Sequence, residues 1–319
     1  MKTFALALCA AGVSAITEVE LEYFNYLAKF GKTIASTTEF LERVENFAVA
    51  HHFIKEHNTS NASFSVAHNQ FSDWSDAEYK AILGAMPTYN EDREYLSFEP
   101  TNASSVNWVT AGAVTGVKDQ GVCGSCWSFS ATGALEGAHF LASGKLESFS
   151  EQQLVSCDTS SYGCNGGYPD YALGWFEKNK AELESVYPYT SGNGRTGTCQ
   201  YDQHSTTSVN TSTYGYVTPD SVSSMMNALA KQPLSILIEA DKMVFQYYSS
   251  GVLNDTRCGT NLDHAVLAVG YGTENGQDYW LVKNSWNTTW GDKGYIKIAR
   301  VDGKGICGVQ MQPVTSASN

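Results

Sequence analysis

Residues 120–127 read Gln-Gly-Val-Cys-Gly-Ser-Cys-Trp, and this stretch decides how the rest of the chain is interpreted. The pair Cys123 and Cys126 allows four interpretations: a thioredoxin-type redox pair, half of a zinc site, part of a disulfide framework, or a catalytic thiol. No βαβ pattern surrounds the pair and no second close pair of cysteines or histidines follows it, which weakens the first two. Apolar spacing predicts a helix from Cys126 to about Leu141, with Gly144 beyond its end. Cys126 then stands at a helix N-terminus, where the helix dipole favours a thiolate.

Further motifs lie on both sides of this stretch. They are NWVTAGAVTGVKDQGVCGSCWSFS from residue 107, SEQQLVSCD from 150, CNGGYPDYA from 164, LDHAVLAVGYG from 262 and VKNSWNTTWGDKGYIKI from 282. Together they resemble the papain family of cysteine proteases, in its cathepsin L-like branch. The resemblance implies an α+β, papain-like two-lobed fold, with a helical left lobe and an antiparallel, β-barrel-like right lobe, preceded by a helical propeptide. It divides the chain into a signal peptide (1–15), an inhibitory propeptide (16–101) and a mature peptidase domain (102–319).

The resemblance also assigns the four groups that acyl transfer requires. Cys126 is the expected nucleophile, and His264 is the expected base and later acid. Asn284 is expected to orient His264, while the Gln120 side chain and the Cys126 backbone N–H form the oxyanion hole. Trp286 is expected to cover the contact between Asn284 and His264.

A substrate pocket follows from the same position-by-position comparison. Its expected lining is apolar or aromatic, with a neutral floor and one backbone contact: Tyr168, Pro169, Leu237, Leu262 and Ala265 as walls, Gln312 as floor, and Gly167 bonding the substrate backbone. Apolar burial of this kind favours Leu, Val, Phe or Tyr two positions before the new N-terminus of the product (position P2). An uncharged floor offers no partner to a buried guanidinium, so Arg is expected to be rejected there.

Cysteine usage indicates an oxidising compartment. Of eight cysteines, Cys9 falls within the expected signal peptide, which leaves an odd number. By resemblance, six of the remaining seven form the bridges Cys123–Cys164, Cys157–Cys199 and Cys258–Cys307. Cys126 then remains free for catalysis, and no metal or cofactor is expected.

The N-terminal segment carries its own signals. Lys2, the apolar run 4–13 and the small residues 13–15 are typical of a cleaved signal peptide. Between residues 16 and 101 the chain has 6 basic and 14 acidic residues and no cysteine. Helical spacing of Phe24, Leu27 and Phe30 predicts one helix that ends at Gly31, and a second is expected from about residue 38 to 58.

Two interspersed patterns in this segment match the family's inhibitory propeptide. The first consists of Glu39, Arg43, Phe47, Ile54 and Asn58, with Ala50 where the family has Asn. The second is AHNQFSD from residue 67, with Ala67 where the family usually has Gly. Residues 87–100 lack periodicity and read as an extended linker that crosses the cleft, with cleavage expected near 102–106.

Composition limits the remaining possibilities. The chain has 319 residues and a net charge of -13, so it repels nucleic acid and anionic lipid surfaces. No apolar run reaches the roughly 18 residues of a membrane span. The resemblance to the papain family implies a monomeric zymogen whose partners are peptide substrates, its own propeptide and cystatin-like inhibitors, with a lysosomal, acidic vacuolar or extracellular destination. Six glycosylation sequons occur, with occupancy open: Asn58, Asn61, Asn102, Asn210, Asn254 and Asn287.

Two other functions compete with this prediction. A non-catalytic secreted binder on the same fold is one, although such proteins lose the nucleophile, base or orienting residue. A thiol–disulfide oxidoreductase is the other, and it requires Cys123 and Cys126 to cycle as a redox pair.

Overall fold

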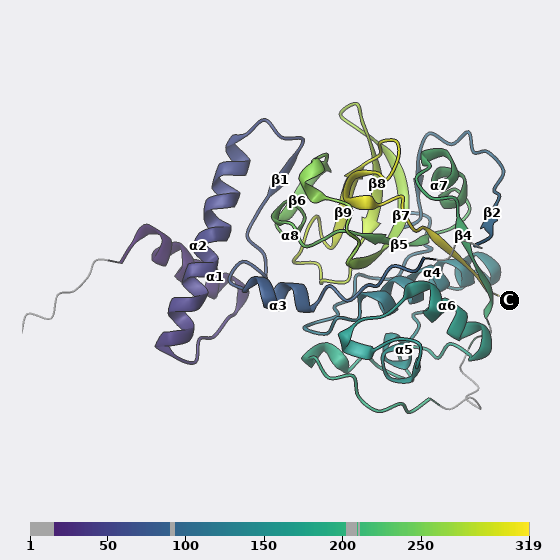
Figure 1. Cartoon of the computed structure of the whole chain (residues 1–319), viewed down its shortest axis with the longest axis horizontal. Helices are drawn as coiled ribbons and strands as arrows, with labels where there is room; N and C mark the ends of the chain where they lie inside the picture. Colours follow the sequence, from purple (N-terminus) through teal and green to yellow (C-terminus); the bar gives the residue numbers. More distant parts are fainter. Residues whose placement is uncertain (1–15, 90–92, 202–208, 210, 319) are drawn as a thin grey trace, which may run out of the picture.

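The structure is a computed structural model that describes residues 16–89, 93–201, 209 and 211–318. The expected signal peptide, residues 1–15, lies outside the described residues. Figure 1 shows three parts: an N-terminal helical segment in purple and blue, a lobe built around strands, and a lobe built around helices. We call the first part the prodomain; it ends with the linker that precedes residue 102.

The prodomain is built on two packed helices, α1 (Glu18–Phe30) and α2 (Thr37–Thr59). Thr17 begins α1 with a capping box and Gly31 ends it at a φ of 62°, a conformation that favours glycine. Tyr23 and Tyr26 are buried against Phe47 of α2, whereas Phe24 is 46% exposed. Of the three residues whose spacing predicted this helix, Leu27 and Phe30 pack against the buried cluster, and only Phe24 is exposed.

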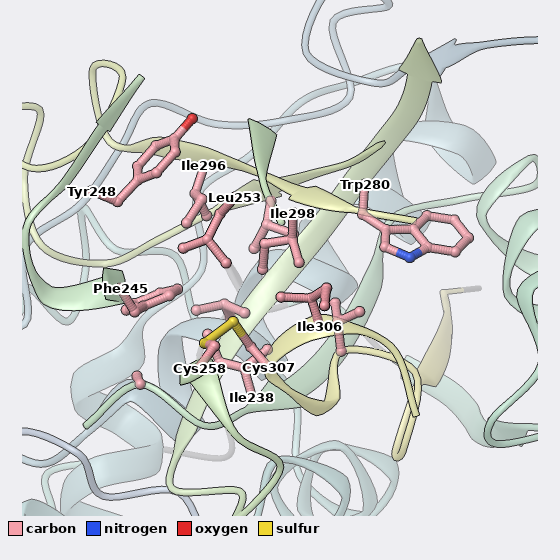
Figure 2. Close-up of a cluster of buried hydrophobic side chains, with 14 of the residues drawn as sticks. Ile238, Phe245, Tyr248, Leu253, Cys258, Trp280, Ile296, Ile298, Ile306 and Cys307 are labelled. Carbon is pink, nitrogen blue, oxygen red and sulfur yellow. A yellow bond between two sulfur atoms is a disulfide. The ribbon is translucent and has the colours of Figure 1, made fainter. Parts of the chain in front are cut away.

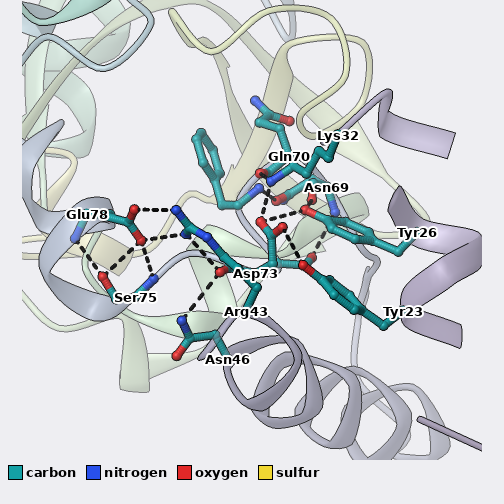
Figure 3. A network of polar contacts seen from close by, with 12 residues as sticks. Tyr23, Tyr26, Lys32, Arg43, Asn46, Asn69, Gln70, Asp73, Ser75 and Glu78 are labelled. Atoms are coloured by element: carbon teal, nitrogen blue, oxygen red, sulfur yellow. Dashed lines mark hydrogen bonds and ion pairs between the residues drawn. The ribbon is translucent and has the colours of Figure 1, made fainter. Parts of the chain in front are cut away.

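The prodomain continues through β1 (Phe64–Val66), α3 (Asp76–Ala81) and β2 (Tyr95–Leu96). The turn between β1 and α3 is fixed by Asp73. Its carboxylate accepts hydrogen bonds from Tyr23 and Tyr26 and pairs with Lys32, while Arg43 spans to Glu78 of α3 (Figure 3).

The helical lobe contains α4 (Cys126–Ser143), α5 (Glu151–Cys157) and α6 (Pro169–Lys178). Gly144 ends α4 in the left-handed conformation, as the sequence predicted. The first fourteen residues of α4 are all buried, because this helix lies between the two lobes and contacts α5, α6 and β7.

The strand lobe holds the remaining elements. They are β3 (Val106–Asn107), β4 (Thr211–Val217), α7 (Val222–Leu229), β5 (Leu234–Ile238), α8 (Met243–Gln246), β6 (Tyr248–Leu253), β7 (His264–Glu274), β8 (Gln277–Lys283), β9 (Tyr295–Ala299) and β10 (Val314–Ser318). The described residues also include four short 3₁₀ turns, at Gly163–Asn165, Ser191–Asn193, Thr256–Cys258 and Ile306–Gly308.

Prodomain strands occupy both ends of the sheet. The strand order is β1-β6-β9-β8-β7-β5-β10-β4-β2, with β3 paired to β7. Strand β1 adds antiparallel to β6, and β2 adds parallel to β4. Each therefore gives backbone partners to an edge strand that would otherwise be open.

The core of the strand lobe is apolar and dense. Ile296 and Ile298 of β9 point inward while Lys297 faces outward, the alternation expected of a strand with one buried face. Figure 2 shows these side chains with Trp280 around the Cys258–Cys307 disulfide.

All three expected disulfides are present: Cys123–Cys164, Cys157–Cys199 and Cys258–Cys307. The first two hold the helical lobe and the third holds the strand lobe. Since Cys123 is bridged to Cys164, it does not form a redox pair with Cys126 in this structure.

Candidate active site

Cys126 is the first residue of α4 and is fully buried. It is the free cysteine of the described residues. Its sulfur faces the backbone N–H groups of Ala265 and Trp127 in the enzyme lobes and of Gly84 in the prodomain. The thiol thus sits where β7 of one lobe meets α4 of the other.

His264 is the first residue of β7 and is also fully buried. Its Nε2 lies 2.8 Å from Oδ1 of Asn284, the residue that follows β8. An amide oxygen only accepts, so Nε2 carries the proton and Nδ1 of the neutral ring is left as a base. Nδ1 has no hydrogen-bond partner in the described residues. Ala265, the next residue, packs directly against Cys126.

Trp286 covers this pair. Its ring stacks on the His264 ring with centroids 4.5 Å apart, and it is 1% exposed. Its Nε1 also donates to Oε1 of Gln120 over 3.1 Å. The indole therefore has two contacts: its ring covers the hydrogen bond between His264 and Asn284, and its N–H holds the side chain of Gln120.

The amide of Gln120 is held in one orientation. Oε1 accepts from Trp286 and from the Ser285 hydroxyl at 2.7 Å, so Nε2 must point the other way. Nε2 donates at 2.8 Å to the carbonyl of Cys123 and at 2.8 Å to that of Ile82 in the prodomain. Sequence reasoning did not single out Ser285, although it lies inside the motif that contains Asn284 and Trp286.

The prodomain passes directly over these groups. Ala85 N–H donates to Asp263 O, Met86 N–H donates to Gly167 O, and Gly167 N–H donates back to Gly84 O. A β-carbon on Gly84 would lie 1.9 Å from Gly124 O, so only glycine permits this approach. The segment that crosses the cleft is therefore 82–86, immediately before the linker that the sequence assigned to this role.

Burial shifts the pKa of both catalytic candidates in this structure. Burial raises the pKa of the Cys126 thiol to about 12, although backbone N–H groups oppose the rise. Burial also lowers the pKa of His264 to about 4, against the opposing effect of the hydrogen bond that its ring donates to Asn284. Both groups are neutral near pH 7 in the covered state, so the thiolate expected at the helix N-terminus is not favoured while the prodomain is bound.

The expected pocket residues gather on one side of Cys126. Leu237, Leu262 and Ala265 form a buried cluster with Cys126 and with Ala85 of the prodomain. Gly167 bonds the prodomain backbone beside them, and Tyr168 and Pro169 begin α6 there.

Gln312, the expected floor of this pocket, and its neighbour Met311 make separate contacts. Gln312 exchanges two hydrogen bonds with the backbone of Thr88, at 2.7 and 3.3 Å. Met311, which the sequence analysis did not select, packs against the apolar cluster.

A buried charge cluster lies behind Asn284. The ammonium of Lys118 lies 2.8 Å from Glu136 and 2.5 Å from Glu151. Burial lowers the pKa of Lys283, which precedes Asn284, to about 8, even though Glu136 opposes the change. Glu136 and Glu151 therefore stabilise the charged forms of the buried lysines, which burial alone would shift toward the neutral amine.

Five of the six sequons fall on described residues. Asn58 uses its side-chain amide to bond both backbone groups of Val66, whereas Asn61, Asn102 and Asn254 are exposed. Asn287 has a φ of 61° and is exposed, so Asn at this position adopts the left-handed conformation usual for glycine. Asn210 lies outside the described residues.

Comparison with known proteins finds a matching family for each of the two parts of the chain. The profile "Papain family cysteine protease" matches residues 102–317, and "Cathepsin propeptide inhibitor domain (I29)" matches residues 23–79. A probable cysteine protease, RD21B of Arabidopsis thaliana, is 44% identical over 95% of this chain and 68% of its own length. Caricain of Carica papaya is 41% identical over 92% of this chain and 86% of its own.

Solved precursors show the same arrangement. A digestive procathepsin L 3 from Tenebrio molitor larval midgut superposes with a TM-score of 0.84 at 35% identity, covering 94% of this chain and 99% of that one. A recombinant stem bromelain precursor gives a TM-score of 0.84 at 32% identity, with the same coverage.

Fold, site and comparisons together define a cysteine endopeptidase with an inhibitory propeptide. The chain belongs to the papain family of cysteine proteases. Among the described residues, no helix combines the length and the apolar character needed to cross a membrane.

Proposed function

We propose that the domain from residue 102 onward hydrolyses internal peptide bonds through Cys126 after the prodomain has been removed. His264 takes the thiol proton on Nδ1, and the sulfur attacks the substrate carbonyl carbon. His264 then gives that proton to the leaving amine, which leaves an acyl-enzyme that water hydrolyses with His264 again as base. The observation that carries this proposal is the buried His264 whose Nε2 is bound by Asn284 and whose Nδ1 is free.

The contacts of Gln120 support the proposed oxyanion hole. Its Nε2 donates to a prodomain carbonyl, that of Ile82, in the covered state. When the prodomain leaves, this donor and the Cys126 N–H become available to the developing oxyanion. One such donor is worth roughly 10²–10³ in kcat.

The prodomain is proposed to inhibit by occupying the cleft. It takes the backbone contacts of Gly167, places Ala85 in the apolar cluster and engages Gln120. We further propose cleavage near residues 102–106, a monomeric mature enzyme, sensitivity to cystatin-like inhibitors, entry into the secretory pathway by residues 1–15, and an acidic vacuolar, lysosomal or extracellular site of action.

Substrate preference is proposed from the apolar cluster. Leu237, Leu262 and Ala265 favour Leu or an aromatic residue at P2, at about 1.5–3 kcal/mol for a fully buried side chain. Gln312 is neutral and offers no compensation to a buried guanidinium.

Two matched dipeptide substrates test this preference. A mature enzyme that acts as proposed cleaves a Phe-Arg substrate with a kcat/KM at least about tenfold above that of Arg-Arg. A Gln312→Glu variant is expected to lower the ratio of kcat/KM for Phe-Arg to that for Arg-Arg, because the carboxylate would compensate the guanidinium at P2. Equal efficiency of the wild-type enzyme on both substrates contradicts the apolar pocket.

A further inference from the structure

The linker of the prodomain makes a second, unassigned contact with the enzyme, away from Cys126. Arg93 lies with its guanidinium carbon 3.8 Å from the centre of the Tyr216 ring. Its Nη2 is 3.8 Å from Oδ2 of Asp170, and the side chains of Arg93 and Asp170 are only 8% and 5% exposed. A stacked guanidinium facing a buried carboxylate is a recognition arrangement for a cation.

The enzyme side of this contact is prearranged. Asp170 lies in the first turn of α6, where its Oδ1 accepts from the Tyr171 N–H and its Oδ2 accepts from the Tyr216 hydroxyl at 2.8 Å. Tyr214 and Gly215 of β4 complete the wall. These bonds do not involve the prodomain, so they can hold the carboxylate after maturation.

Among the described residues, prodomain side chains cover Asp170 and Tyr216. Thr88 donates to Asp170 Oδ2 at 2.5 Å and accepts from Arg93 at 2.6 Å. Tyr89, Glu94 and Leu96 line the prodomain side of the cavity beside Arg93 and Tyr216. All of these residues precede residue 102 and leave on maturation, which opens a carboxylate bordered by tyrosine rings.

The site also lies along the substrate cleft. Asp170 directly follows Tyr168 and Pro169 of the proposed P2 pocket. Thr88, which bonds Asp170, is held at the same time by Gln312. A substrate that extends from the P2 pocket away from Cys126 therefore runs toward this pair.

We propose that Asp170 and Tyr216 of the mature enzyme form a subsite for an arginine side chain located N-terminal to the P2 residue of the substrate. Arg93 occupies it in the zymogen as a built-in ligand. The planar guanidinium stacks on Tyr216 and faces Asp170, an arrangement that a lysine ammonium reproduces less well. This subsite rests on the proposed peptidase function. It adds a preference for arginine on the N-terminal side of P2 to the preference for apolar side chains at P2.

The test uses the mature enzyme and peptides with Leu at P2. Arg is placed at P3, P4 or P5 and compared with its neutral isostere citrulline at the same position. At one position at least, Arg is expected to raise kcat/KM about fivefold or more, mainly through KM. Equal values at all three positions contradict the subsite. Cleavage of the citrulline peptides tests the peptidase function separately, because its absence contradicts that function.

Three variants identify the source of the preference. Asp170→Asn is expected to bring the Arg-to-citrulline ratio close to one, and Tyr216→Leu to lower it. Asp302→Asn removes the same charge from an exposed loop and is expected to keep the ratio. A preference that survives Asp170→Asn, or that Asp302→Asn abolishes equally, reflects the overall negative charge and overturns the subsite. If the Asp170→Asn variant does not mature, the Arg-to-citrulline ratio of the Tyr216→Leu variant tests the subsite instead, and an unchanged ratio there overturns it.

Discussion

At the scale of single residues, function depends on how each side chain is oriented. Gln120 illustrates this, since two donors fix its Oε1 and leave Nε2 as the only group that can face a carbonyl. Asn284 does the same for His264 by determining which ring nitrogen carries the proton. These residues could be singled out from sequence because the motifs that contain them resemble those of the papain family, and their catalytic roles stay predictions.

Other residues could not be anticipated from sequence. Phe24 has the spacing of a core residue yet is largely exposed, because Tyr23 and Tyr26 also reach Asp73 and gain hydrogen bonds there. Arg93 stands in a linker without periodicity, so nothing local indicates that it contacts Tyr216. Contacts between residues far apart in sequence are decided by the tertiary fold.

The buried charges behind Asn284 give a residue-scale prediction. Glu136→Gln leaves Lys118 and Lys283 with less compensation and is expected to lower the free energy of unfolding by about 3–5 kcal/mol. Urea denaturation of an inactive Cys126→Ala zymogen measures the change. The control is Glu42→Gln, at an exposed residue of α2, for which a change within about 0.5 kcal/mol is expected. A loss below about 1 kcal/mol for Glu136→Gln contradicts the role of the cluster.

At the scale of elements, segment 82–86 crosses the cleft and is the element that we propose to inhibit the enzyme, while the two prodomain strands pair with β6 and β4. Gly84 is the point of closest approach, with no room for a β-carbon beside Gly124. The sequence located the helices well because their caps and apolar spacing are local signals. It placed the cleft crossing in the linker, since a backbone approach of this kind leaves little trace in sequence.

Replacing Gly84 tests this element. Gly84→Ala forces the segment away from Gly124 and is expected to raise the inhibition constant of the free prodomain by about tenfold or more. A loss of about 1.4 kcal/mol in binding free energy is enough for a tenfold change. Titration of the mature enzyme with separately produced prodomain measures it. Lys80→Ala, at an exposed residue of α3, serves as the control and is expected to change inhibition little. Equal inhibition by the Gly84→Ala and wild-type prodomains rules out the close approach as the basis of inhibition.

At the scale of the whole molecule, an acidic prodomain is joined to an acidic enzyme, and acid is expected to separate them. Burial acts to raise the pKa of Glu78, but hydrogen bonds from Arg43 and Ser75 outweigh it and hold the pKa below the ordinary 4.5. A carboxyl group with a lowered pKa in the folded state stabilises that state above its unfolded pKa. This stabilisation is lost as the pH falls below about 4.5.

Self-processing is therefore expected to be faster near pH 4 than near pH 7, as judged by the rate of prodomain loss on gels. In a Glu78→Gln variant, part of this pH dependence is expected to disappear because the prodomain is already weakened at neutral pH. A wild-type zymogen that matures unaided fastest at neutral pH contradicts acid control.

The nucleophile assignment is the central claim, and self-maturation tests it most directly. Purified wild-type zymogen and Cys126→Ala zymogen are held near pH 4 without other proteases, and the products are followed by N-terminal sequencing. The account predicts that the wild-type chain loses its prodomain and yields a new N-terminus near residues 102–106, while Cys126→Ala remains full length. Self-maturation of Cys126→Ala at a measurable rate would contradict the assignment of Cys126 as the nucleophile.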